Sequence, residues 1–244
     1  LWKMGKKMIH VLYEDNHVLV VEKPVNIPVQ EDSSHDLDLL TMCKQYIKET
    51  YNKPGNVYLG LVHRLDRPVG GVMIFAKTSK AASRLSDQVR THTFKKEYLA
   101  VLDGTPKKKQ GTLVDYLKKD TKNNRVTVTN EKEGKKSILH YDVLETKHNR
   151  TLVHITLETG RSHQIRVQFS SRNLPLVYDQ RYNPHTKKGQ IALYAYQLTF
   201  IHPTQKEPMT ISCLPSKKDP WNLFEVEQCL KNTEEKDTSE KVCL

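Results

Sequence analysis

Short apolar runs separated by polar turns dominate the first part of the chain and predict β-strands. Residues 9–13 and 18–21 are rich in β-branched side chains and are separated by four polar residues, which predicts a hairpin. An apolar run follows Gly70-Gly71 and predicts a buried strand. Residues 93–102 alternate between apolar and polar positions and predict a strand that contains Tyr98.

Two segments instead carry apolar residues at helical spacing. Residues 36–51 have such a face, with Ser34 or Asp36 as the expected N-cap and a stop at the Asn-Lys-Pro-Gly sequence that follows. A second helix is expected after Thr78 or Ser79, either of which can accept a hydrogen bond from its first turn. Both helices are expected to pack against the sheet through their apolar faces.

The second half of the chain consists mainly of further alternating segments. Because most strands follow one another through hairpins with few helices between them, we predict an α+β fold with a mixed, largely antiparallel sheet. A closing helix is expected near the end, and residues 231–244 are polar enough to form a charged flexible tail. The expected strands are 113–117, 125–128, 137–144, 151–157, 191–201 and 208–213, and the closing helix is 221–230.

Composition limits the class of protein. Among 244 residues, 37% are hydrophobic and 27% are charged, which is typical of a globular protein, and no internal repeat or linker divides residues 1–230, so they are predicted to form one domain. The four cysteines are far apart and lack zinc spacing, and no apolar stretch is long enough to cross a membrane. We therefore expect a cytoplasmic protein, most simply a monomer, without a metal or membrane contact.

The charge balance points to nucleic acid. The net charge is +11, and lysines are concentrated in 107–109 and 118–136, where exposed hairpins are expected. A basic surplus of this size attracts phosphate backbones regardless of sequence, although a generically basic surface would look the same.

A lone carboxylate, Asp66, lies among basic residues in the sequence His63-Arg64-Leu65-Asp66-Arg67. Positive neighbours favour the ionised form of a carboxylate, and the two glycines that follow let the backbone approach another molecule closely. Such an Asp can act as a nucleophile or a base; the alternative is a salt-bridged surface turn. Lys23, after the second predicted strand, is expected either at a ligand or in a solvated loop.

A second polar group follows the strand at residues 151–157. There Thr159 or Ser162 is expected to cap a short helix whose start presents Arg161, His163 and Arg166. Free N–H groups and basic side chains at a helix start are suited to an anion or a carboxylate.

In combination these motifs resemble the RluA-type pseudouridine synthases, a family that isomerises uridine in RNA. The resemblance covers about residues 9 to 215, with 32 positions from Asp66 to Tyr98 and 100 from Asp66 to Arg166. Four motifs carry it, in this order: His63-Arg64-Leu65-Asp66 with the Gly-Gly turn, Lys96-Glu97-Tyr98-Leu99-Ala100, Thr159-Gly160-Arg161-Ser162-His163-Gln164-Ile165-Arg166-Val167, and Leu193-Tyr194-Ala195-Tyr196-Gln197-Leu198 with Ile201-His202-Pro203.

The resemblance implies conversion of uridine to pseudouridine in ribosomal or transfer RNA without a cofactor or metal. It implies that Asp66 is the catalytic carboxylate, which either attacks C1′ of the ribose or takes the C2′ proton. Tyr98 is then expected to stack on the base, and Arg166 to pair with Asp66 and keep it ionised. The implied fold is a curved sheet in two lobes with Asp66 in the cleft between them.

The target uridine must leave its base stack, because it is not accessible inside folded RNA. By resemblance, Arg64 holds the flipped nucleotide, since a planar guanidinium can stack on bases. His63, Arg161, His163 and Gln164 are expected to bind the substrate.

Two departures from the family pattern leave other functions open. After the catalytic Asp the family usually has Thr-Ser-Gly, whereas this chain has Pro68-Val69-Gly70-Gly71. The family also has a Gly-Asp pair later in the chain, and here Tyr178 replaces its glycine. The altered turn is compatible with an RNA-binding homologue that is catalytically impaired. A metal-dependent hydrolase or nuclease that uses Asp66 with His63 and His163 is a third possibility.

Overall fold

The computed structural model describes residues 2–4 and 7–232. The chain folds into two compact units. Unit 1 consists of Leu1–Glu97 and Tyr194–Cys213, and unit 2 consists of Tyr98–Leu193 and Leu214–Leu244. Among the described residues, no helix is both long enough and apolar enough to cross a membrane.

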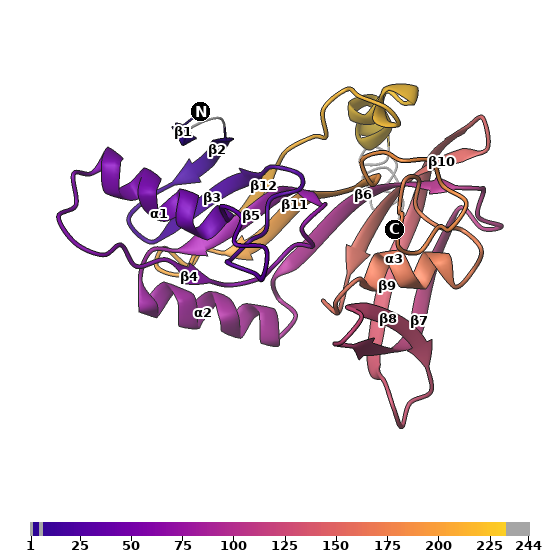
Figure 1. Cartoon of the computed structure of the whole chain (residues 1–244), viewed down its shortest axis with the longest axis horizontal. Helices are drawn as coiled ribbons and strands as arrows, with labels where there is room; N and C mark the ends of the chain where they lie inside the picture. The colour runs from indigo at the N-terminus through magenta and orange to yellow at the C-terminus, as the bar shows by residue number, and fades with distance from the viewer. Residues whose placement is uncertain (1, 5–6, 233–244) are drawn as a thin grey trace, which may run out of the picture. The chain divides into compact units, whose positions relative to one another are not determined.

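Unit 1 is a sheet with two helices (Figure 1). Its strands lie in the order β1-β2-β3-β5-β11, with β4 added to β5 and β12 to β11. All these neighbours are antiparallel except β5 and β11. The strands are β1 (Trp2–Met4), β2 (Lys7–Glu14), β3 (Val18–Lys23), β4 (Gly60–Leu61), β5 (Gly70–Ala76), β11 (Leu193–Ile201) and β12 (Pro208–Ser212).

The two helices of unit 1 are α1 (Leu39–Thr50) and α2 (Ser79–Arg90). Thr78 caps α2 as expected, because its side chain accepts a hydrogen bond from Ala81 N–H. The expected N-cap of α1 is wrong: Asp38 has the extended backbone of a cap and accepts from Thr41 N–H. Figure 1 shows α2 along β4 and β5, where its Ala81 and Leu85 join a buried hydrophobic cluster that includes residues of β3, β5 and β11.

Unit 2 is a mainly antiparallel sheet with two short helices, α3 and a helix that begins at residue 226. Its strands lie in the order β6-β10-β9-β7-β8, and α3 packs on β7 and β8. Leu117, Val126, Val167 and Tyr182 form the buried cluster at this contact. The elements are β6 (Lys95–Asp103, from Tyr98 onward in this unit), β7 (Gln110–Asp120), β8 (Arg125–Thr129), β9 (Lys135–Lys147), β10 (Arg150–Leu157) and α3 (Gln164–Ser170).

These elements confirm the predicted α+β fold with largely antiparallel strands. The closing helix differs from the prediction, because the chain makes a 3-10 turn at Trp221–Leu223 and becomes extended at Phe224 before a helix begins at residue 226. The last twelve positions of the predicted tail, 233–244, lie outside the described residues. The assignment of residues 1–230 to one domain and the cleft between two lobes stay predictions.

Gly71 permits the parallel contact between β5 and β11. Its φ is +123°, and a Cβ atom there would lie 2.1 Å from the carbonyl oxygen of Ala195. We therefore expect Gly71→Ala to lower the free energy of unfolding by about 2 to 4 kcal/mol, through backbone strain and overpacking. Urea denaturation measures the loss, and Gly55→Ala is the matched control, since a Cβ at Gly55 meets nothing within 4 Å. Equal stability of the two variants would contradict this packing.

Candidate active site

Asp66 lies in a tight turn between β4 and β5. The N–H group of Val69 donates to the carbonyl oxygen of Asp66 at 2.9 Å, which closes the turn around Pro68. Asp66 itself is half-buried. The departure Pro68-Val69 from the family's usual sequence therefore still forms a closed, hydrogen-bonded turn.

Lys23 holds this turn from inside the protein. Its side chain is fully buried, and its Nζ donates to the carbonyl oxygens of Pro24 at 3.0 Å, Arg67 at 3.0 Å and Val69 at 2.7 Å. An ammonium group has three hydrogens, so all of them are used by backbone. The expectation of a solvated loop lysine is wrong, because Lys23 is buried and fixes the backbone on both sides of Pro68. A place for Lys23 at a ligand stays a prediction.

The charge of Lys23 has a measurable consequence. Burial lowers the pKa of Lys23 to about 7, although the nearby charge of Asp66 favours the ammonium form. Between this pKa and the unfolded value near 10.5, the unfolded chain binds a proton that the folded chain lacks. The contribution of Lys23 to the free energy of unfolding therefore rises with pH in that window.

We expect the stability difference between wild type and Lys23→Met to shift in favour of wild type as pH rises from about 7 to about 9.5. Urea denaturation of both proteins at several pH values measures it, and the other titrating groups cancel in the difference. Lys77→Met is the control for losing a largely buried lysine, because the Lys77 side chain is 11% exposed and pairs with Glu14 at 2.6 Å in the same unit. A difference that does not change with pH would contradict the assigned pKa.

Arg67 fixes the same turn from the outside. Its guanidinium donates to Ser34 Oγ at 2.9 Å and to Asp36, and it lies 3.5 Å from Asp32. Side chains from the segment before α1 thus bind the residue that follows Asp66. The turn that carries Asp66 is therefore fixed both by Lys23 and by this acidic segment.

His63 and Arg64, which precede the turn, have different surroundings. Burial lowers the pKa of His63 to about 3, so its ring is neutral and adds no positive charge beside Asp66. Its Nε2 accepts from Ile74 N–H at 3.3 Å, and its buried Nδ1 has no hydrogen-bond partner among the described residues. Arg64 is exposed. Substrate binding by His63 and Arg64 stays a prediction, although the contacts of His63 are those of a core histidine.

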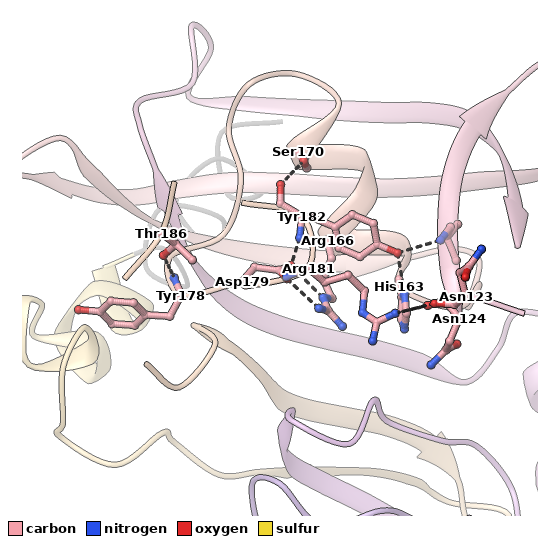
Figure 2. Close-up of polar contacts among 11 residues, drawn as sticks. Asn123, Asn124, His163, Arg166, Ser170, Tyr178, Asp179, Arg181, Tyr182 and Thr186 are labelled. Carbon is pink, nitrogen blue, oxygen red and sulfur yellow. Dashed lines mark hydrogen bonds and ion pairs between the residues drawn. The ribbon is translucent and has the colours of Figure 1, made fainter. Parts of the chain in front are cut away.

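In unit 2, Arg166 forms a buried ion pair with Asp179 (Figure 2). Its Nε lies 2.8 Å from Asp179 Oδ2, and its Nη2 lies 2.7 Å from Oδ1. The side chains are 6% and 0% exposed, so both charges are desolvated and depend on each other. This role of Asp179 was not predicted from the sequence. The one indication of it was that Asp179 is the Asp of the altered Gly-Asp pair.

The start of α3 differs from the expected capping. The N-cap is His163, which has a φ of +52° and makes no side-chain cap hydrogen bond. Gln164 organises the segment instead: its Oε1 accepts from Thr159 Oγ1 at 2.8 Å and from Arg161 N–H at 3.0 Å, and its Nε2 donates to Ile138 O at 3.0 Å. Arg161 is exposed, with its Nε 3.2 Å from Lys136 O.

The predicted site residues thus fall into two groups. His63, Arg64 and Asp66 belong to unit 1, whereas Tyr98, Arg161, His163, Gln164 and Arg166 belong to unit 2. Tyr98 lies on β6 and is 7% exposed. The expected pairing of Arg166 with Asp66 joins residues of both units and stays a prediction.

Chemically, the turn of unit 1 presents a carboxylate on a fixed backbone, and α3 of unit 2 presents a guanidinium held by two hydrogen bonds. A fixed carboxylate can attack an electrophilic carbon or take a proton. A guanidinium in a fixed position can hold an anionic group in place.

The family described as RNA pseudouridylate synthase matches residues 17–171 of the chain. Ribosomal large subunit pseudouridine synthase C of Buchnera aphidicola subsp. Baizongia pistaciae is 33% identical over 214 residues, which are 83% of this chain and 65% of that protein. The uncharacterized RNA pseudouridine synthase YlyB of Bacillus subtilis is 34% identical over 221 residues, which are 89% of this chain and 72% of that protein. The chain spans 63–66% of the length of three Buchnera synthases that it matches.

Solved structures show the same fold. Human RNA pseudouridylate synthase domain containing 4 is similar with a TM-score of 0.71 and 21% identity, over 85% of this chain and 89% of that one. Human RNA pseudouridylate synthase domain containing 1 is similar with a TM-score of 0.70 and 22% identity, over 89% of this chain and 87% of that one.

Proposed function

The chain belongs to the RNA pseudouridylate synthase family, and we propose that it isomerises specific uridines in ribosomal or transfer RNA to pseudouridine. The observation that carries the proposal is Asp66 in a turn whose backbone is fixed by Lys23, within a family match that includes this turn. The names of the Buchnera relatives favour ribosomal RNA as the substrate.

In this reaction, the bond between C1′ and N1 of uridine breaks, the uracil turns, and a bond between C1′ and C5 forms. C5 then loses its proton and N1 gains one, so the product is an isomer and no co-reactant is needed. Asp66 starts the reaction either by attacking C1′ or by taking the C2′ proton. Both routes need an ionised carboxylate at a fixed position beside the sugar, as in glycosidases.

Tyr98 and Arg166 act with Asp66 in this proposal. Tyr98 stacks on the uracil and helps to remove the C5 proton, and Arg166 pairs with Asp66. The buried ion pair of Arg166 with Asp179 supports its role, because it fixes the position of the guanidinium. Arg64 holds the flipped nucleotide, and Arg161, His163, Gln164 and His63 complete the substrate site.

The net charge of +11 supports RNA as the partner, since lysine and arginine contacts to phosphates give affinity that falls with salt. Arg125, Lys118, Lys119 and Lys122 are exposed on the β7–β8 hairpin and can supply such contacts. We also propose that the protein is a monomer and acts in the cytoplasm.

Purified protein incubated with ribosomal and transfer RNA transcripts tests the activity. We expect pseudouridine at defined positions, undiminished by a metal chelator. Mass spectrometry of the digested RNA measures it. RNA that binds but stays unmodified would favour the alternative, a catalytically impaired RNA-binding homologue, and loss of activity in the chelator would favour a metal-dependent enzyme.

A further inference from the structure

Tyr182 connects the predicted substrate residues of unit 2 with the β7–β8 hairpin (Figure 2). It is 7% exposed, and its hydroxyl lies 2.7 Å from His163 Nδ1 and 2.9 Å from the backbone nitrogen of Val126. It lies three residues after Asp179, in the segment that departs from the family's Gly-Asp pattern.

These two contacts limit the hydrogen positions. The N–H group of Val126 can only donate, so the Tyr182 oxygen accepts from it. The oxygen keeps its hydrogen and a second lone pair, so the direction of the contact with His163 Nδ1 depends on the tautomer of the ring. If the hydroxyl donates, Nδ1 is unprotonated and Nε2 of a neutral ring carries the hydrogen. Burial raises the pKa of Tyr182 above its usual value near 10, so the hydroxyl keeps its hydrogen.

Tyr182 also touches the Arg166–Asp179 pair. Its ring lies 5.2 Å from the guanidinium carbon of Arg166, and its N–H donates to Asp179 Oδ1 at 3.3 Å. Its carbonyl oxygen accepts from Ser170 Oγ at 2.8 Å, which fastens the loop to the last residue of α3. One residue thus contacts both His163 and the ion pair that holds Arg166.

We propose that Tyr182 is a positioning residue for the reaction, whose hydroxyl fixes His163 as a hydrogen-bond donor at Nε2 and whose ring and backbone hold the Arg166–Asp179 pair. The proposal deepens the proposed function and rests on it. Whatever acceptor Nε2 meets, in the protein or in RNA, His163 meets it as a donor and not as a general base.

The tautomer is tested in the wild-type protein without any activity measurement. We expect 15N spectra of histidine-labelled protein at neutral pH to show Nδ1 of His163 as the unprotonated nitrogen and Nε2 as the protonated one. The spectrum of His163→Gln identifies the signal, since only that histidine is lost. Protonation at Nδ1, or at both nitrogens, overturns the proposal.

Kinetics test the positioning role. Tyr182→Phe removes only the hydroxyl, and we expect kcat with saturating RNA to fall roughly tenfold, which corresponds to about 1.4 kcal/mol. Tyr141→Phe is the matched control, because Tyr141 is buried in the same unit and, among the described residues, its hydroxyl donates a hydrogen bond only to Lys108 O, at 3.5 Å. A kcat that is equal in the two variants overturns the proposal.

The tautomer also separates positioning from a loss of structure. Without the hydroxyl, Nδ1 of His163 loses the donor that keeps it unprotonated in this proposal. We expect the 15N spectrum of Tyr182→Phe to show a changed share of the two His163 tautomers, and that of Tyr141→Phe to match the wild type. An unchanged His163 signal in Tyr182→Phe overturns the proposal.

The failures of the two proposals are distinguishable. Wild-type protein that modifies no RNA refutes the proposed function, whatever the spectrum of His163 shows. Active wild-type protein whose Tyr182→Phe variant matches Tyr141→Phe refutes only the role of Tyr182. His163→Gln keeps an amide N–H near the Nε2 position, so it should retain more activity than His163→Asn; the reverse order also refutes that role.

Discussion

Asp66→Ala is expected to abolish pseudouridine formation, to below about one thousandth of the wild-type rate, while RNA affinity stays within a few-fold. The carboxylate is the reacting group in both routes, so no other side chain can replace it. The fold should persist, because the turn is closed by the Val69–Asp66 backbone hydrogen bond and held by Lys23 through backbone oxygens. These contacts do not need the side chain of Asp66.

Two measurements on the same RNA check this prediction. Mass spectrometry gives the rate of pseudouridine formation, and fluorescence anisotropy at a fixed salt concentration gives the affinity. Asp87→Ala is the control, since Asp87 is an exposed carboxylate of α2 that pairs only locally with Arg90. Activity that survives in Asp66→Ala would rule out the mechanism, and a large loss of affinity would show that Asp66 contributes to binding instead.

Asp179→Asn is expected to lower the free energy of unfolding by about 3 to 5 kcal/mol, because it leaves the buried Arg166 guanidinium without its anion. Asp179 is 1% exposed and also accepts from the backbone N–H groups of Arg181 and Tyr182. The amide of Asn can accept from some of these donors but brings a donor of its own against the guanidinium. Arg166 should lose its orientation, so kcat should fall as well.

Asp115→Asn is the matched control for this pair. Asp115 pairs with Arg172 at 2.8 Å in the same unit, but the Arg172 side chain is 35% exposed and can be solvated when the anion is removed. We therefore expect a loss of only about 1 kcal/mol or less. Urea denaturation measures both variants, and similar losses would show that the Arg166–Asp179 pair gains nothing from its burial.

Individual residues show which structural features could be predicted from the sequence and which could not. Thr78 was identifiable as a cap because a cap and its partner lie three residues apart. The N-cap of α1 was misplaced, because Ser34, Asp36 and Asp38 all have capping side chains and only the structure shows that Asp36 binds Arg67 instead. The expected closing helix was interrupted at Phe224, whose extended backbone no periodicity indicated.

The sequence by itself determined most of the strands, the two helices of unit 1, the α+β class and the family, together with Asp66, Tyr98 and Arg166 as candidate catalytic residues. These properties depend on local periodicity and on short motifs, so they can be predicted without knowing which residues are in contact in the folded protein. Only the tertiary structure decided that Lys23 is bonded to the turn of Asp66, that Asp179 holds Arg166, that His63 is neutral and that Tyr182 contacts His163. Charge state, burial and hydrogen-bond partners depend on atoms that lie far apart along the chain, and folding alone brings them together.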